Sequence, residues 1–241
     1  MSDVSNADAP PERVMAIYAH PDDPEFFSGG LLAKWAAAGK QIAYVLATSG
    51  DKGSDDPEMT SEALIALREA EQRAAAACLG VQQVIFLRYP DGELEHTLRL
   101  RRDLTRLIRQ IRPDIVITND PQTVWTLSGG INHPDHRAIG EAALAAVYPS
   151  ARDRLTFIEL WRDEGLQPHK VRQVYLAGTL APNCKVDITA YLDRKIEAIS
   201  QHRSQIKDLE ALTRRLRANS DPDFERDAPL YTESYRVLTL R

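Results

Sequence analysis

The fold of this 241-residue chain is decided by the stretch Val14-Met15-Ala16-Ile17-Tyr18-Ala19-His20-Pro21-Asp22-Asp23. Its first six residues are an unbroken apolar run, which is typical of a strand buried on both faces of a parallel sheet. Polar and turn-forming residues follow at once. In open α/β sheets, ligands bind beyond the carboxyl ends of the strands, so we expect this strand to deliver the polar residues to a site.

Strand and helix patterns alternate along the rest of the chain. Strand-like apolar runs cover residues 42–47, 84–87, 114–118, 155–160 and 171–177. Helical patterns cover residues 28–38, 60–79, 98–111, 134–147 and 188–206. This alternation predicts an α/β protein, with a Rossmann-like three-layer fold, a mostly parallel sheet and helices on both faces. We expect a single domain over 1–241, with a flexible lead-in at 1–13 and a tail of uncertain structure at 219–241.

The composition excludes several classes of protein. With 43% hydrophobic residues the chain can fill a core, and its net charge of −5 argues against a nucleic-acid partner. No apolar run approaches the ~20 residues that cross a bilayer, so no membrane insertion is expected. The polar, acidic start lacks the basic and apolar regions of a secretory signal. These features predict a cytoplasmic protein.

A cluster of chemical side chains follows the first strand. It combines the imidazole of His20 with the carboxylates of Asp22, Asp23 and Glu25. No glycine-rich phosphate loop occurs there, and clustered carboxylates repel phosphate, so metal binding is favoured over nucleotide binding. Imidazole and carboxylate are both zinc ligands, and adjacent turn residues point in different directions, which leaves Asp22 free to face a water while Asp23 binds. The simpler alternative is an acidic helix start, where Asp is favoured.

A second cluster begins another helix far along the chain. In Asn132-His133-Pro134-Asp135-His136, proline fits a first helical turn, and the two histidines lie three residues apart on one side. The cluster follows the strand expected at 114–118, so it should lie at the same edge of the sheet as His20. Either histidine alone would suit an ordinary hydrogen-bonded position. Together, the two clusters predict one shared metal site.

These two motifs resemble the LmbE/PIG-L family of zinc-dependent N-deacetylases. The resemblance rests on Ala19-His20-Pro21-Asp22-Asp23 with Glu25, and on His133-Pro134-Asp135-His136. It covers roughly residues 14–205, and the pairing of the two motifs is more specific than either one. Further similar positions are Thr48 to Gly53, Arg68, Glu71, Leu79-Gly80, Pro90-Asp91-Gly92, Arg112-Pro113-Asp114, Val186-Asp187-Ile188, Lys195, Ala198, His202, Ser204 and Gln205.

The resemblance implies a role for each motif residue. One zinc ion per chain would be held by His20, Asp23 and His136. Asp22 would be the general base, His133 would stabilise the tetrahedral intermediate, and Asp135 would orient a histidine nearby. Pro24 interrupts the plainest form of the family motif, which leaves the role of Glu25 open.

The implied reaction removes an N-acetyl group from an N-acetylglucosamine-type sugar conjugate, releasing acetate and a free amine. A zinc-activated water attacks the amide with Asp22 as base. The resemblance also places Arg68 and His202 near the substrate. From the residues alone, Arg68 suits a surface ion pair with Glu71, three positions along a helix, and His202 suits packing or solvation.

Other readings of the site remain open. A thiol-conjugate amidase would use the same residues, and a non-catalytic metal-binding or sugar-binding domain would keep the ligands without turnover. A metallo-phosphoesterase usually needs two metals, for which three clear ligands are too few. The substrate should be a small molecule selected by the loops at 50–59 and 122–132. Family members often assemble, so a homo-oligomer stays open.

Overall fold

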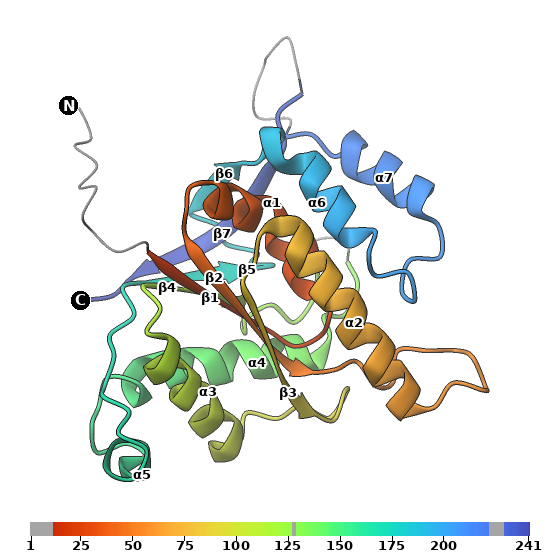
Figure 1. Cartoon of the computed structure of the whole chain (residues 1–241). Helices are drawn as coiled ribbons and strands as arrows, with labels where there is room; N and C mark the ends of the chain where they lie inside the picture. The colour runs from red at the N-terminus through yellow and green to blue at the C-terminus, as the bar shows by residue number, and fades with distance from the viewer. Residues whose placement is uncertain (1–11, 127–128, 222–228) are drawn as a thin grey trace, which may run out of the picture.

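The computed structural model describes residues 12–126, 129–221 and 229–241, and its strands form one sheet (Figure 1). The strands are β1 Arg13–Tyr18, β2 Gln41–Thr48, β3 Gln83–Tyr89, β4 Ile115–Asn119, β5 Gln173–Ala177, β6 Cys184–Asp187 and β7 Thr232–Thr239. Their order across the sheet is β3-β2-β1-β4-β5-β7-β6. The strands from β3 to β5 in this order run parallel, while β7 runs antiparallel to both β5 and β6. The carboxyl ends of the five parallel strands therefore meet at one edge.

Helices cover both faces of this sheet. They are α1 Asp23–Ala37, α2 Ser61–Leu79, α3 Leu98–Ile111, α4 Pro134–Ala145, α5 Ile158–Arg162, α6 Leu192–Ile199 and α7 Leu209–Ala218. Helices α1, α2 and α6 pack together on one face, and α3 and α4 lie on the other (Figure 1). Within the described ranges, no helix is long and apolar enough to cross a bilayer.

Strand β1 explains the three layers. Its side chains alternate between the two faces of the sheet, and all of them beyond Arg13 are buried. Met15 and Ile17 enter the core under α3 and α4, whereas Val14 and Ala16 enter the core under α1, α2 and α6. The expected α/β fold with a mostly parallel sheet is confirmed.

Three expected elements are wrong in detail. The run at 155–160 is not a strand, because Leu155 is exposed and Phe157 has a left-handed backbone (φ 52°), after which α5 begins. The helix expected over 188–206 is much shorter, since α6 ends at Ile199 and turns follow. Helix α1 begins five residues before the expected start at 28, with acidic residues in its first turn.

The chain ends also differ from expectation. Residues 1–11 lie outside the described residues, but Arg13, assigned to the lead-in, is the first residue of β1. In the tail, residues 222–228 are likewise outside the described residues. Beyond them β7 enters the sheet between β5 and β6. The tail therefore contributes part of the sheet.

A buried carboxylate of β7 ties this late strand to helix α1. Glu233 accepts hydrogen bonds from the backbone N–H groups of Gly30 (2.9 Å) and Leu31 (2.8 Å). The ammonium of Lys195 on α6 lies 2.7 Å from the same carboxylate and also donates to the carbonyl of Phe26. Glu233 and Lys195 are both buried, so β7, α1 and α6 share one ionic contact.

Replacing Glu233 with Ala is expected to lower the free energy of unfolding by about 3–5 kcal/mol. The substitution leaves the buried ammonium of Lys195 without its counter-charge, and it removes the carboxylate to which the N–H groups of Gly30 and Leu31 donate. Urea denaturation measures this loss. Glu210→Ala is the matched control, since Glu210 pairs with Arg214 at the exposed surface and should change stability by at most about 1 kcal/mol. Equal losses for the two variants would contradict the buried contact.

Candidate active site

The turn between β1 and α1 carries the first cluster. The backbone N–H of His20 donates to Asp23 Oδ2 (2.9 Å), which closes the turn tightly. Asp22 precedes the first residue of α1 and has a left-handed backbone (φ 91°), a conformation uncommon for any residue with a side chain. This turn leaves His20 and Asp23 almost fully buried and Asp22 partly exposed beside them.

The second cluster starts helix α4, which follows the loop after β4. His133 is the N-cap residue, and its Nδ1 accepts the backbone N–H of Asp135 (3.2 Å). Pro134 occupies the first helical position, as expected for a residue without an N–H group. His136 is oriented by Asn132, whose Oδ1 lies 3.1 Å from its Nδ1. The other ring nitrogen, Nε2, is left to face the first cluster.

The two clusters converge as expected. Asp23 lies between two imidazoles, with Oδ1 3.0 Å from His136 Nε2 and Oδ2 3.4 Å from His20 Nδ1. One ligand atom from each of the three residues lies within 4.8 Å of the others, so they could hold a metal ion together. This set of two imidazoles and one carboxylate is typical of catalytic zinc sites.

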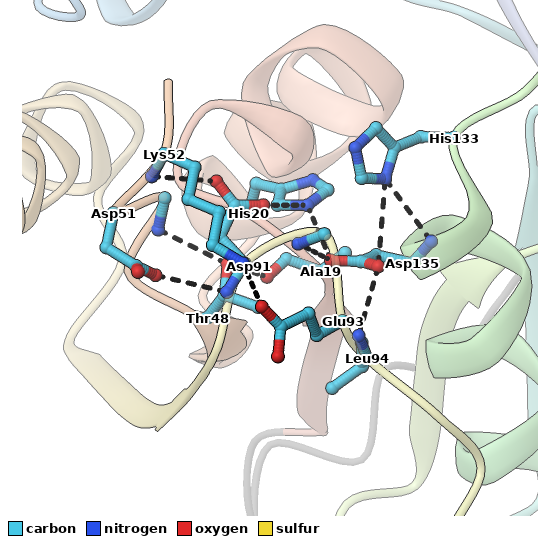
Figure 2. A network of polar contacts seen from close by, with 12 residues as sticks. Ala19, His20, Thr48, Asp51, Lys52, Asp91, Glu93, Leu94, His133 and Asp135 are labelled. Carbon is cyan, nitrogen blue, oxygen red and sulfur yellow. Dashed lines mark hydrogen bonds and ion pairs between the residues drawn. The ribbon is translucent and has the colours of Figure 1, made fainter. Parts of the chain in front are cut away.

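A second group could also hold a metal ion, and it shares His20. It comprises His20, His133 and Asp135. However, Asp135 is fully buried and already accepts the backbone N–H groups of Gly92 (2.8 Å) and Leu94 (3.2 Å) (Figure 2). Its oxygens are therefore committed to holding the loop after β3, and Asp135 suits orienting His20 better than binding an ion.

The sequence did not identify Asp91 as a site residue, but it lies against His20. Its Oδ1 is 3.1 Å from His20 Nε2, and Asp135 Oδ2 lies 3.2 Å from the same nitrogen (Figure 2). Asp91 lies two residues beyond the end of β3, and this position at the carboxyl end of a strand was the signal that could have found it. Both carboxylates fix the orientation of the His20 ring.

Carboxylates dominate the electrostatics of the pocket. Burial by itself would lower the pKa of His20, but bonds to surrounding carboxylates outweigh burial and raise that pKa to about 12. Burial acts to raise the pKa of Asp23, yet the neighbouring His136 and His20 hold it well below its usual range. Asp23 is therefore ionised, as a metal ligand must be.

Asp22 has a different environment from its neighbour. Burial and the negative charge of Asp23 raise the pKa of Asp22 to about 7, although the guanidinium of Arg68 acts in the opposite direction. Arg68 Nη2 lies 3.3 Å from Asp22 Oδ2. Adjacent residues of one turn thus carry one firmly ionised carboxylate and one that exchanges its proton near neutral pH.

These residues surround a cavity of about 290 Å³. Its lining consists of His20, Asp22, Asp23, Gly53, Arg68, Asp91, His133 and His136. Gly53 also borders a second cavity of about 470 Å³. Polar side chains line it, from the loop after β2 and from Ser204, Gln205 and Lys207. The site therefore opens toward a polar groove that suits a hydroxyl-rich ligand.

The two expected substrate contacts have different outcomes. Arg68 reaches the cavity, but its guanidinium also binds the carbonyls of Gly50 (3.1 Å) and Pro21 (2.8 Å). His202 is fully buried, and its Nε2 lies 3.1 Å from Glu25 Oε2. Direct contact with a substrate requires exposed surface, which His202 lacks, so the structure places it as a buried partner of Glu25 instead.

The open α/β sheet thus presents two histidines and a carboxylate at its carboxyl edge, where they could hold a metal ion. Residues 15–147 match the family PIG-L, described as GlcNAc-PI de-N-acetylase. A diacetylchitobiose deacetylase of Thermococcus kodakarensis is 34% identical over 194 residues, covering 80% of this chain and 70% of that protein. The chain belongs to the PIG-L family, as its motifs predicted.

Two further similarities concern structure and substrate range. The solved structure of N,N'-diacetylchitobiose deacetylase from Pyrococcus horikoshii, in complex with an inhibitor, superposes with a TM-score of 0.84 at 32% identity. The match covers 95% of this chain and 84% of that one. A mycothiol S-conjugate amidase of Streptomyces coelicolor is 29% identical over 207 residues, which cover 77% of this chain and 68% of that protein. The relatives thus include both deacetylases and an amidase.

Proposed function

We propose that this chain is a zinc-dependent deacetylase that removes an N-acetyl group from an N-acetylglucosamine-type sugar conjugate. The observation that carries the proposal is the convergence of His20, Asp23 and His136 beside Asp22, in a cavity that opens to a polar groove. Water adds to the acetyl carbon, the C–N bond breaks, and acetate and a free amine leave. We assign residues 1–241 to one deacetylase domain, since β7 lies in the same sheet as β1.

The donor set supports zinc as the metal, with one ion per chain. Imidazole nitrogens suit zinc, whereas calcium and magnesium prefer sites made of oxygen atoms. His20 would bind through Nδ1, because its Nε2 is engaged by Asp91 and Asp135. When bound, zinc polarises a carbonyl oxygen and lowers the pKa of a water molecule to about 7.

Asp22 is the proposed general base. It lines the cavity, belongs to the same turn as His20 and Asp23, and contributes no atom to the candidate ligand group. Its carboxylate accepts a proton from the attacking water and returns that proton to the nitrogen of the departing amine. Arg68, 3.3 Å away, holds the carboxylate in place for both transfers.

His133 is the proposed donor to the developing oxyanion. Its Nδ1 accepts the N–H of Asp135, so the proton of the neutral ring lies on Nε2. Burial and the nearby charge of His20 lower the pKa of His133, which favours this neutral form over the charged form. His133 then acts through an N–H hydrogen bond, while Asp135 orients His20 through its carboxylate and His133 through its backbone N–H.

Replacing His133 with Ala is expected to lower kcat by about 10²–10³-fold, the cost of losing one oxyanion donor. Steady-state kinetics with an N-acetylated sugar should give a KM changed by no more than about twofold, because the bond forms mainly in the transition state. His133→Gln keeps an N–H donor and should lose less activity. Equal losses for His133→Ala and His133→Gln would argue against the hydrogen bond as the cause.

A thiol-conjugate amidase is the alternative within the same site chemistry, and one relative bears such a name. The two activities differ in the acyl group that leaves. Incubating the zinc-loaded protein separately with an N-acetyl sugar and with a sugar bearing a thiol-conjugated acyl group tests the proposal. Faster amine release from the N-acetyl sugar supports the deacetylase, and the reverse supports the amidase. Release from neither favours a non-catalytic binding domain.

A further inference from the structure

Two side chains of helix α2 form hydrogen bonds with one peptide group of the catalytic turn, one at its carbonyl and one at its N–H. Arg68 Nη2 donates to the carbonyl of Pro21 (2.8 Å), and Gln72 Oε1 accepts the N–H of Asp22 (2.8 Å). That carbonyl and that N–H belong to the same peptide group, and Arg68 and Gln72 lie one helical turn apart. The contacts fix the plane of the peptide that precedes Asp22.

These two hydrogen bonds are important because Asp22 has an unfavourable backbone conformation. Its φ of 91° lies in the left-handed region, which residues with a side chain rarely occupy unless their surroundings hold them there. The direction of the Asp22 side chain depends on that dihedral angle. Rotation of the preceding peptide would therefore move the carboxylate away from the cavity.

Buried neighbours determine which way the Gln72 amide points. Its Nε2 donates to both carboxylate oxygens of Glu25, at 3.0 and 3.1 Å, which leaves Oε1 to face Asp22. Glu25 in turn is held by His202, whose Nε2 lies 3.1 Å from Oε2. Gln72, Glu25 and His202 are all 0% exposed. A carboxylate can only accept, so the reversed amide would set two acceptors against each other.

We propose that Gln72 is a positioning residue that holds Asp22 in its reactive conformation, with Glu25 and His202 acting through it. The proposal rests on the proposed function, in which Asp22 is the general base. Gln72 is fully buried and does not line the cavity, so it touches neither substrate nor metal. It also assigns a positioning role to Glu25 and His202, two residues of the family resemblance that take no part in the reaction itself.

Gln72→Met is the first test, because methionine fills a similar volume without hydrogen bonds. We expect kcat to fall by about 10²-fold, the scale of loss from misplacing a reactive group by 1 Å, with KM changed less than about twofold. Zinc content should remain at one per chain. Gln110→Met is the matched control, since Gln110 is exposed on α3, and it should leave all three quantities unchanged.

A reciprocal exchange separates orientation from simple loss of packing. Gln72→Glu alone places two carboxylates together and should lower kcat as Gln72→Met does. Adding Glu25→Gln restores the pairing of donors with acceptors: the carboxylate at position 72 accepts from the Asp22 N–H and from the new side-chain amide at position 25, and the oxygen of that amide accepts from His202. The kcat of the double variant should therefore be at least tenfold higher than that of Gln72→Glu alone. Failure to recover would overturn the proposal.

The Asp22 amide itself gives a readout that does not depend on activity. In protein labelled with ¹⁵N-aspartate, hydrogen exchange of the Asp22 N–H should accelerate at least tenfold in Gln72→Met and stay unchanged in Gln110→Met. Unchanged exchange in Gln72→Met would overturn the positioning role. If exchange accelerates but the wild-type protein releases no amine from any N-acetyl compound, the proposed function fails while the contact stands.

A double-variant cycle tests the route of the effect. In an Asp22→Asn background, Gln72→Met should lower the residual kcat by less than twofold, because the group it positions has already been disabled. A full further loss would mean that Gln72 acts on some other part of the site, and it would contradict the proposal.

Discussion

Replacing Asp22 with Asn is expected to lower kcat by about 10²–10⁴-fold, the contribution of a positioned general base. Asparagine keeps the size of the side chain and can still accept a hydrogen bond from Arg68, but it cannot take a proton from water. The proposed metal ligands His20, Asp23 and His136 are untouched. Zinc content should therefore stay at one per chain while turnover of an N-acetylated sugar collapses.

Asp163→Asn provides the control for this variant. Asp163 is an exposed residue directly after α5 and forms an ion pair with Arg162 at the surface. Its loss should leave kcat within about twofold of the wild type, since exposed pairs contribute little. If Asp22→Asn were equally active at full zinc content, another group would have to be the base.

Replacing His136 with Ala is expected to abolish both metal binding and turnover. His136 supplies one of three candidate ligands, with Nε2 3.0 Å from Asp23 Oδ1. Loss of even a residue that orients a ligand typically weakens metal affinity by about 10–100-fold, so loss of the ligand itself should exceed about 100-fold. Competition with a chromophoric chelator measures the affinity, and amine release measures the turnover.

His96→Ala is the matched control for His136→Ala. His96 lies outside the cavity, and its Nδ1 is 3.5 Å from Glu141, an exposed carboxylate. Zinc affinity and kcat should match those of the wild type. A zinc affinity in His136→Ala within tenfold of the wild type would contradict the ligand assignment. It would favour the group containing His133 and Asp135 as the metal site.

The sequence was sufficient to locate the site because its clues are local. An apolar run predicted β1, and the polar residues that follow such a strand are bound to lie at the carboxyl edge of the sheet. Proline and paired histidines predicted the start of α4. The same edge rule then brought His20 and His136 together, although 115 residues separate them along the chain.

The rest depended on contacts between distant segments. Strand β7 does alternate, but Glu233, which points inward, is charged, so the pattern does not resemble a buried strand until Lys195 is placed beside it. Gln72 looks like an ordinary polar residue of a helix, since its partner Asp22 is 50 positions away. His202 was expected near the substrate and instead contacts Glu25, a partner 177 positions away that only the fold brings close.

A zinc titration of metal-free protein, with amine release as the readout, tests the proposed zinc-dependent deacetylation. N-acetylglucosamine and N,N'-diacetylchitobiose serve as substrates, and acetate is measured in parallel. We expect no amine without metal, a linear rise in rate up to one zinc per chain, and acetate equal to amine. Amine release that is independent of zinc, or none at any zinc level with any N-acetylated sugar, would contradict the proposal.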